Sequence, residues 1–225
     1  MFKKNITLLF IALFAALLLA ACGGTATTPT TNSTSSTSST AADGPDSDGD
    51  GIPDAAEPVL GTDPNNADTD GDGQNDLADP NPMLADNPIQ ESGTAVTFTI
   101  SGLQVENNVD ADGADVPDHL EFKVTNTSTA DLTNFDIYTT ITDQTTGDVQ
   151  GYYQTLPGLT VKAGETKTIH FDNTDQPDHF SVNPNSAFYT DQNGLTLEVT
   201  LHAAGYAPQT GSVDKDPGGA EGGVE

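Results

Sequence analysis

The sequence predicts a mainly β protein, in which an acidic segment with little regular secondary structure precedes an antiparallel β-sandwich. Three observations support this prediction. Apolar and polar residues alternate with period two over several short stretches in the second half of the chain. Turn-forming Asn, Asp, Gly and Pro residues separate those stretches. No stretch of helical period and useful length follows the apolar run near the start of the chain.

The charge of the chain limits its partners. It has 34 Asp and Glu residues against 6 basic residues, which gives a formal net charge of -28. Binding of phosphate groups needs a basic surface, so nucleic acid is excluded as a partner. All six basic residues are lysines, which also excludes bidentate recognition by arginine. Such a chain must stay highly solvated or take up cations.

Residues 1–21 are expected to form a signal peptide. Lys3 and Lys4 give it a charged start, and the apolar run Ile6–Leu19 is shorter than the roughly 20 residues that a membrane-spanning helix needs. The run ends in Leu19-Ala20-Ala21-Cys22, which resembles the bacterial lipobox. This resemblance implies export and attachment of lipid to Cys22, the only cysteine of the chain. We therefore expect a lipid anchor in the membrane of a bacterial cell envelope, at the surface or on the periplasm-facing outer membrane. A chance cysteine beside an ordinary cleavage site is the alternative.

Residues 22–42 are rich in Thr and Ser and are expected to form a flexible tether, because they lack the apolar bulk to bury a core. The segment that follows, residues 43–86, carries thirteen carboxylates and no basic residue. Without counterions a segment of this charge density repels itself and stays extended. Its order therefore depends on bound cations.

The most specific motif of the chain is DSDGDGIPDAAE, which begins at Asp46. Its spacing is that of a twelve-residue calcium loop, in which alternate oxygen ligands point inward and Gly51 at position 6 permits the sharp turn. The predicted ligands at positions 1, 3, 5, 7, 9 and 12 are Asp46, Asp48, Asp50, Ile52, Asp54 and Glu57. Position 7 contributes its backbone carbonyl. An all-oxygen set suits Ca²⁺, whereas zinc prefers His and Cys.

The same pattern recurs 22 residues later as DTDGDGQNDLAD. The predicted ligands of this second loop are Asp68, Asp70, Asp72, Gln74, Asp76 and Asp79. Asp79 is shorter than the glutamate usual at position 12, which lowers the expected affinity. A disordered acidic linker is the alternative interpretation, but composition alone does not impose the same phase twice.

A third candidate metal site lies between Asn108 and Glu121, where two incomplete registers of the loop pattern overlap. The candidate ligands are Asn108, Asp110, Asp112, Asp118 and Glu121. A plain acidic loop between strands explains the same residues, and both interpretations stay open.

The run from Asp46 to Asp79, with Gly61-Thr62-Asp63-Pro64 between the loops, resembles the thrombospondin type 3 repeats of bacterial surface proteins. The resemblance implies calcium wrapped by a chain with little secondary structure, which acts as a rigid, calcium-dependent spacer. Dockerin modules share the 22-residue period, but there each loop leads into a helix. Pro58 and Pro80 follow the loops here and argue against such helices.

Residues 94–207 are expected to form the β-sandwich, with seven or so strands between Ala95 and Ala207. The alternating apolar sets are Val96, Phe98 and Ile100; Leu120, Phe122 and Val124; Phe135, Ile137 and Ile141; and Leu195, Leu197, Val199 and Leu201. The segment Phe122–Ser128 resembles immunoglobulin-like modules of bacterial surface proteins, which implies a fold and no ligand. Residues 208–225 are rich in Gly, Asp and Glu and are expected to form a disordered acidic tail.

Catalysis is not expected. The four histidines are His119, His170, His179 and His202, which are widely separated in sequence and have no paired spacing. No nucleophile motif accompanies them. The sequence therefore predicts a non-enzymatic, calcium-binding, lipid-anchored cell-surface protein in which the repeats act as a spacer that presents the sandwich. The alternatives are a calcium-dependent adhesion or glycan- or protein-binding module, and, third, a surface hydrolase.

Overall fold

The computed structural model describes residues 44–90, 93–105, 112–114 and 116–219. The predicted signal peptide, Cys22 and the Thr/Ser tether lie outside these residues. Within the described ranges, no helix is long and apolar enough to cross a membrane.

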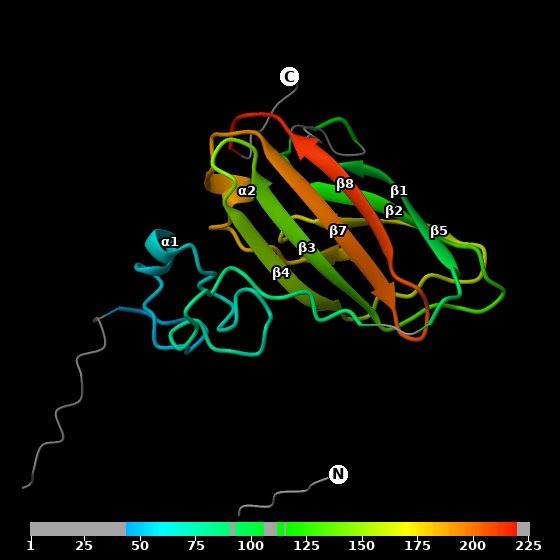
Figure 1. Ribbon diagram of the computed structural model, residues 1–225, viewed down its shortest axis with the longest axis horizontal. Coiled ribbons are helices and arrows are strands. Elements are labelled where there is room, and N and C mark those ends of the chain that lie inside the picture. The colour runs from blue at the N-terminus through cyan, green and yellow to red at the C-terminus, as the bar shows by residue number, and fades with distance from the viewer. Residues whose placement is uncertain (1–43, 91–92, 106–111, 115, 220–225) are drawn as a thin grey trace, which may run out of the picture. The chain divides into compact units, whose positions relative to one another are not determined.

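The described chain contains two four-stranded sheets (Figure 1). One sheet consists, in spatial order, of β1 (Phe98–Gln104), β2 (Leu120–Asn126), β5 (Thr166–Phe171) and β6 (His179–Phe180). The other consists of β4 (Val149–Leu156), β3 (Phe135–Asp143), β7 (Leu195–Ala203) and β8 (Gln209–Lys215). The two described helices, α1 (Glu57–Leu60) and α2 (Ala187–Thr190), are single turns. The predicted mainly β sandwich is thus confirmed.

The period-two pattern of the sequence forms the core between the sheets. On β2, Leu120, Phe122 and Val124 are buried while Lys123 between them is exposed. The strands β3 and β7 pair over nine residues and bury alternate apolar side chains in the same way. Val96 departs from the prediction, because it lies before β1 and is 60% exposed.

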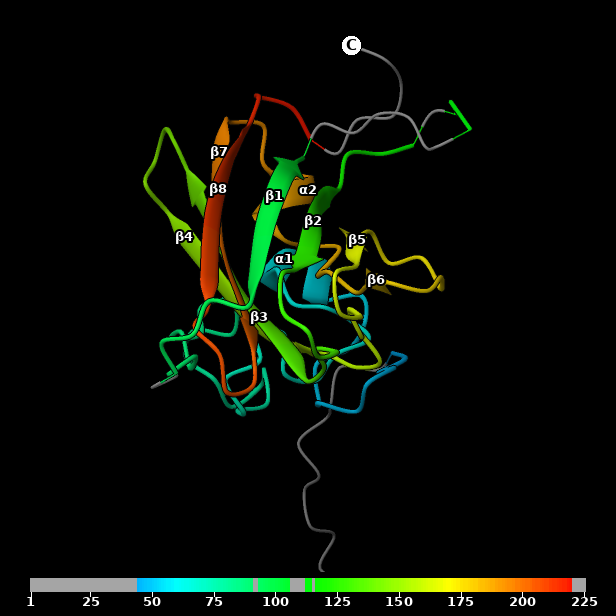
Figure 2. The ribbon, with the colours of Figure 1, turned by 90° about the vertical axis from the view of Figure 1, so that its right-hand side faces the viewer.

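The strand order is that of an immunoglobulin-like sandwich. The first two strands and β5 share one sheet, while β3 and β7 are central in the other, with β4 and β8 at its edges. At one side of the sandwich the strands β1 and β8, which belong to different sheets, lie next to each other (Figure 2). β6 is an exception to the antiparallel pattern, since its two residues pair with β5 in parallel.

The predicted boundary of the sandwich at residue 207 is wrong. β8 occupies Gln209–Lys215, inside the segment expected to be a disordered tail, and pairs with β7 along its whole length. Most of its side chains are exposed or half-buried, so the strand is held by backbone hydrogen bonds that composition does not reveal. Its last residue, Lys215, is buried and forms an ion pair with Asp118 at 3.3 Å.

The acidic repeat segment packs against the sandwich along β4. Leu84 forms a parallel bridge with Gly151, and the Gly151 N–H donates to the carbonyl of Met83 at 2.9 Å. The Tyr138 hydroxyl donates to the carbonyl of Ala85 at 2.9 Å. The segment and the sandwich therefore belong to one compact unit.

Candidate metal centre

The first predicted calcium loop is wound around the carboxylate of Asp46. This carboxylate accepts the N–H groups of Gly49 at 2.8 Å and Gly51 at 3.2 Å. Both glycines have positive φ, 80° and 101°, which lets the chain turn sharply around the side chain. The Asp50 carboxylate accepts the N–H of Ile52 at 2.6 Å. Loop position 1 thus organises the turn in the way the sequence spacing predicts.

The second loop repeats this geometry residue by residue. Asp68 accepts the N–H groups of Gly71 and Gly73, both at 3.0 Å. The φ angles of these glycines, 79° and 93°, match those of the first loop. Two copies of one backbone path, 22 residues apart, are not the geometry of an unstructured acidic linker.

Position 9 has the same structural role in both loops. The Asp54 carboxylate accepts both the N–H and the hydroxyl of Ser47, at 2.7 and 2.8 Å. The Asp76 carboxylate accepts the corresponding groups of Thr69, at 2.8 and 2.6 Å. These bonds close each loop by joining position 2 to position 9.

Among the residues that the structure describes, carboxylates gather in three clusters, in each of which ligand oxygens lie within 4.8 Å of one another. The clusters are Asp46, Asp48 and Asp50; Asp68, Asp70 and Asp72; and Asp50, Glu57 and Asp76. The first two are positions 1, 3 and 5 of the two loops. The third was not foreseen, because it joins Asp76 of the second loop to two residues of the first. Spacing within one loop carries no information about that approach.

Several of these oxygens are buried without a hydrogen-bond donor among the described residues. They are Asp48 Oδ2, Asp50 Oδ2, Glu57 Oε2 and Asp70 Oδ2. A buried carboxylate oxygen that lacks a donor is costly. A hard divalent cation satisfies several such oxygens at once, and Ca²⁺ accepts about six to eight. The clusters therefore fit the metal that the sequence predicts.

Burial also raises the pKa values of carboxyls in these clusters. Burial, followed by the charges of Asp48 and Asp50, raises the pKa of Glu57 to about 7. Burial, opposed in part by a hydrogen bond from the Asp72 backbone, raises the pKa of Asp70 to about 6. A cation within these clusters would favour the ionised form of both side chains.

Four ligands predicted for the two loops lie outside these clusters, namely Ile52, Asp54, Gln74 and Asp79. The side chain of Gln74 is exposed and donates to Asp72 at 2.8 Å. The carboxylate of Asp79 accepts the N–H of Asn81 at 2.8 Å. The role predicted for residue 74 concerns its backbone carbonyl, which these contacts leave available.

The second loop is held against the sandwich by its backbone. The Tyr153 N–H on β4 donates to the carbonyl of Asp70 at 2.7 Å. A Cβ atom on Gly71 would collide with the carbonyl oxygen of Tyr153. The linker between the loops is held as well, since the amide groups of Asn183 and Asn185 donate to the carbonyls of Gly61 and Thr62, both at 2.6 Å.

Asp63 is a buried residue of this junction that lies outside both loop patterns. Its side chain is 8% exposed, and burial raises its pKa. Its N–H donates to the Thr69 hydroxyl at 2.8 Å, which links the segment between the loops to the second loop. The Gly61-Thr62-Asp63-Pro64 motif was the available signal.

The third candidate site lies partly outside the described residues, since Asn108 and Asp110 are not among them. The described members do not share one cluster. Asp118 is paired with Lys215, and Glu121 lies 3.4 Å from the Nδ1 atom of His170. Asp112 lies in a turn before β2 and is exposed.

Comparison with known protein families finds a match to the bacterial TSP3 repeat over residues 46–67. This span covers the first loop and the linker after it, and it supports the thrombospondin-like resemblance there. Comparison with curated proteins finds no significant match.

Solved structures resemble the chain only weakly. A β-glucuronidase 2 from Bacteroides uniformis has a TM-score of 0.29 at 15% identity, over 54% of this chain and 13% of that one. The alkylpurine DNA glycosylase AlkC from Pseudomonas fluorescens has a TM-score of 0.30 at 14% sequence identity, over 53% of this chain and 30% of that one. The sporulation control protein Spo0M from Bacillus subtilis has a TM-score of 0.28 at 12% sequence identity, over 53% of this chain and 49% of that one. The chain thus spans less than half the length of each of these proteins, and similarities this low support no argument about activity.

Proposed function

We propose that this protein is a calcium-binding, lipid-anchored protein of a bacterial cell surface, without enzymatic activity. Ca²⁺ orders its repeats into a rigid spacer that presents the β-sandwich. The observation that carries this proposal is the set of buried carboxylate oxygens without donors at equivalent places of two loops, Asp48 Oδ2 and Asp70 Oδ2 among them. The match to the bacterial TSP3 repeat supports it independently.

The docking of the repeats explains how calcium would act on the sandwich. The backbone carbonyl that receives the Tyr153 N–H belongs to Asp70, a predicted ligand. An ion bound by the Asp70 carboxylate would fix the same residue whose carbonyl pairs with β4. Calcium therefore both orders the spacer and sets its orientation relative to the sandwich. With dissociation constants of about 10⁻⁴ to 10⁻³ M, typical of extracellular modules, the loops would load at millimolar calcium.

The binding-module alternative has less support. A cavity of about 90 Å³ lies between the repeats and the sandwich and is lined by residues that include Asp63, Thr69, Tyr152 and Asn183. Pockets for small organic ligands have volumes of about 300 to 1,000 Å³. This cavity is too small for such a ligand, and it suits a few ordered water molecules.

A calcium titration by calorimetry tests the proposal. Asp48→Asn and Asp70→Asn each keep the size of the side chain and remove one ligand charge, so each variant should lose one site and retain the other. Glu198→Gln, an exposed position on β7, is the matched control and should bind calcium as the wild type does. No saturable binding by the wild type would overturn the proposal.

Proteolysis with and without chelator tests the spacer mechanism. We expect protection of residues 44–86 only in calcium. Mass spectrometry of protein recovered from bacterial membranes tests the anchor, since Cys22→Ser should abolish both the lipid mass and membrane association. A chain that stays membrane-bound after this substitution would contradict the proposed attachment.

A further inference from the structure

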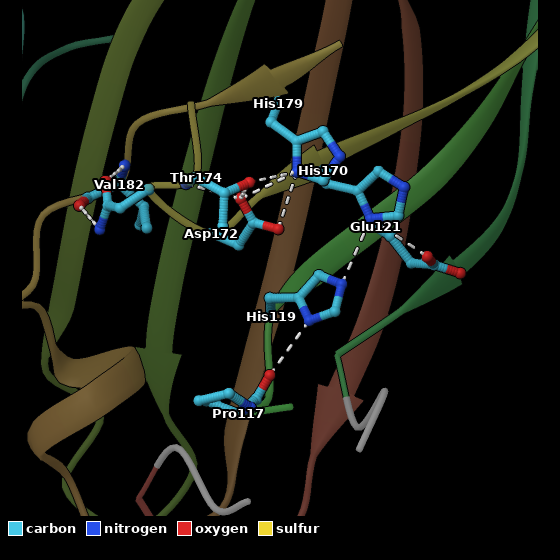
Figure 3. A network of polar contacts seen from close by, with 9 residues as sticks. Pro117, His119, Glu121, His170, Asp172, Thr174, His179 and Val182 are labelled. Carbon is cyan, nitrogen blue, oxygen red and sulfur yellow. Dashed lines mark hydrogen bonds and ion pairs between the residues drawn. The ribbon is translucent and has the colours of Figure 1, made fainter. Parts of the chain in front are cut away.

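Three of the four histidines lie together on the outer side of the sheet that contains β2 and β5 (Figure 3). The strand register explains their approach. Glu121 on β2 is opposite His170 on β5, and His170 is opposite His179 on β6. The neighbouring residues Leu120 and Phe171 point into the core. The row formed by Glu121, His170 and His179 therefore points away from it.

Each end of the row adds another side chain on the same side of the sheet. His119 lies two residues before Glu121, and Asp172 lies two residues after His170. Alternation along a strand places residues two apart on one face. Antiparallel pairing therefore brings together side chains that are about fifty residues apart in sequence, which is why their spacing gave no signal.

The distances in this cluster are short enough for its side chains to share a metal ion. His119 Nε2 lies 3.3 Å from His170 Nδ1, and Glu121 Oε2 lies 3.4 Å from the same nitrogen. Zinc–nitrogen bonds of about 2.0–2.1 Å in tetrahedral geometry separate neighbouring ligand atoms by about 3.3 Å. Ligand atoms of His119, His170 and Asp172 all lie within 4.8 Å of one another.

Surrounding hydrogen bonds prepare these atoms as ligands. His119 Nδ1 lies 3.1 Å from the carbonyl of Pro117, an acceptor, so Nδ1 carries the proton and the Nε2 lone pair faces His170. A metal-binding histidine usually donates its other ring N–H in this way. The carboxylate of Asp172 is held by the N–H of Thr174 at 3.0 Å and by His179 Nδ1 at 2.9 Å. His119 is 6% exposed, so its ring is fixed by packing.

We propose that this cluster is a second metal centre, which binds a transition-metal ion of the Zn²⁺ type and not calcium. The proposed ligands are one ring nitrogen each of His119 and His170 and a carboxylate oxygen of Asp172, which lie within 4.8 Å of one another. Imidazole nitrogen suits zinc, whereas calcium prefers oxygen ligands throughout. An ion here would join β2 to β5 and the turn after it, independently of the calcium loops.

A Zn²⁺ titration of the full chain in excess calcium tests this proposal, with a chromogenic zinc indicator as competitor. Calcium saturates the acidic loops and leaves the histidine cluster for zinc. We expect one Zn²⁺ per chain, with affinity lowered at least about tenfold in His170→Gln and His119→Gln. His202→Gln is the matched control, because His202 contacts Asp136 at 2.8 Å on the other sheet, and it should bind zinc as the wild type does.

Histidine side-chain NMR of the wild-type protein gives a second measurement that does not depend on folding of the variants. Zn²⁺ should shift the imidazole resonances of His119 and His170 and leave those of His202 in place. No saturable zinc binding in calcium would overturn the proposal. Zinc binding that persists unchanged in His170→Gln would also overturn it, since the ion would then lie on carboxylates elsewhere.

Discussion

The repeat segment and the β-sandwich bury opposite kinds of side chains. Between residues 44 and 90 the buried apolar side chains are those of Ile52 and Ala85, whereas Glu57, Asp70 and Asp76 are buried carboxylates. The sandwich instead buries an apolar cluster that extends across both sheets. Apolar burial stabilises a fold without a ligand. Buried like charges repel one another, so a bound cation would stabilise the repeat segment, whereas burial of apolar side chains stabilises the core of the sandwich.

The two regions nevertheless meet through ordinary hydrogen bonds. β4 receives the second loop and the chain after it, and the Asn183 amide holds the linker between the loops. The acidic segment is thus attached to the sandwich through backbone groups of β4 and through polar side chains such as Asn183 and Tyr138. Substitutions should have their largest effect on stability in the core of the sandwich and a smaller one at its junction with the repeat segment, and pH should have the smallest effect, on the loops.

The largest expected effect is that of Phe122→Ala in the core of the sandwich. Phe122 is fully buried and stacks on Phe171 with ring centroids 6.1 Å apart. Loss of a buried phenylalanine side chain costs about 3–5 kcal/mol. Denaturant unfolding should show this loss equally in calcium and in chelator. Val59→Ala, at a position 87% exposed, is the control. A loss of stability that appears only in chelator would contradict this difference between the two regions.

A smaller loss of stability distinguishes the docking of the second loop on β4 from the geometry of the loop itself. Two glycines at the same position of the two loops allow this comparison. Gly49 and Gly71 have φ angles of 80° and 79°, so alanine introduces the same backbone strain, about 1–2 kcal/mol, at either position. A Cβ atom on Gly49 meets nothing within 4 Å, whereas one on Gly71 collides with the Tyr153 carbonyl. Gly71→Ala should therefore cost about 1–3 kcal/mol more.

Thermal unfolding in saturating calcium measures this difference. Equal losses for the two variants would mean that contact with β4 contributes nothing to the stability of the repeat segment. A larger loss in Gly71→Ala, accompanied by faster proteolysis of residues 44–86, would show that the sandwich supports the loops.

The smallest expected effect is the pH dependence of calcium binding. The raised pKa values, about 7 for Glu57 and about 6 for Asp70, mean that in the calcium-free protein the Glu57 carboxyl holds its proton below about pH 7 and the Asp70 carboxyl below about pH 6. Calcium must displace these protons, so affinity should fall roughly tenfold from pH 8 to pH 6 for each proton displaced at a pKa near 7. Calorimetry in buffers of different ionisation enthalpy counts the protons released.

The raised pKa values of Glu57 and Asp70 also determine how the stability of the calcium-free protein changes with pH. A carboxyl whose folded pKa is raised contributes stability below its unfolded pKa, near 4, and loses it as the pH rises through the folded value. The calcium-free protein should therefore lose stability between about pH 4 and pH 7, and the gain in melting temperature on adding calcium should widen over that range. A gain that stays constant with pH would contradict the burial of these carboxyls.

Much of the loop geometry could be predicted from spacing. Positions 1 and 6 of each loop lie a few residues apart, and the turn of Asp46 around Gly51 is a local property of the backbone. The strand β2 is predictable for the same reason, because alternation of apolar residues is a local pattern. The disordered tail was a wrong prediction, since β8 is held by pairing to β7 and its own composition is polar.

The sequence by itself determined where the two acidic loops lie, which oxygens they offer to a cation and which face of each strand enters the core. Only the tertiary structure decided that Asp76 approaches Asp50 and Glu57, that Gly71 lies against Tyr153, and that His119 meets His170. The physical reason is the range of the forces involved. Loop and strand geometry follow from neighbours along the chain, whereas these contacts depend on strand register and docking, which bring together residues up to about eighty positions apart.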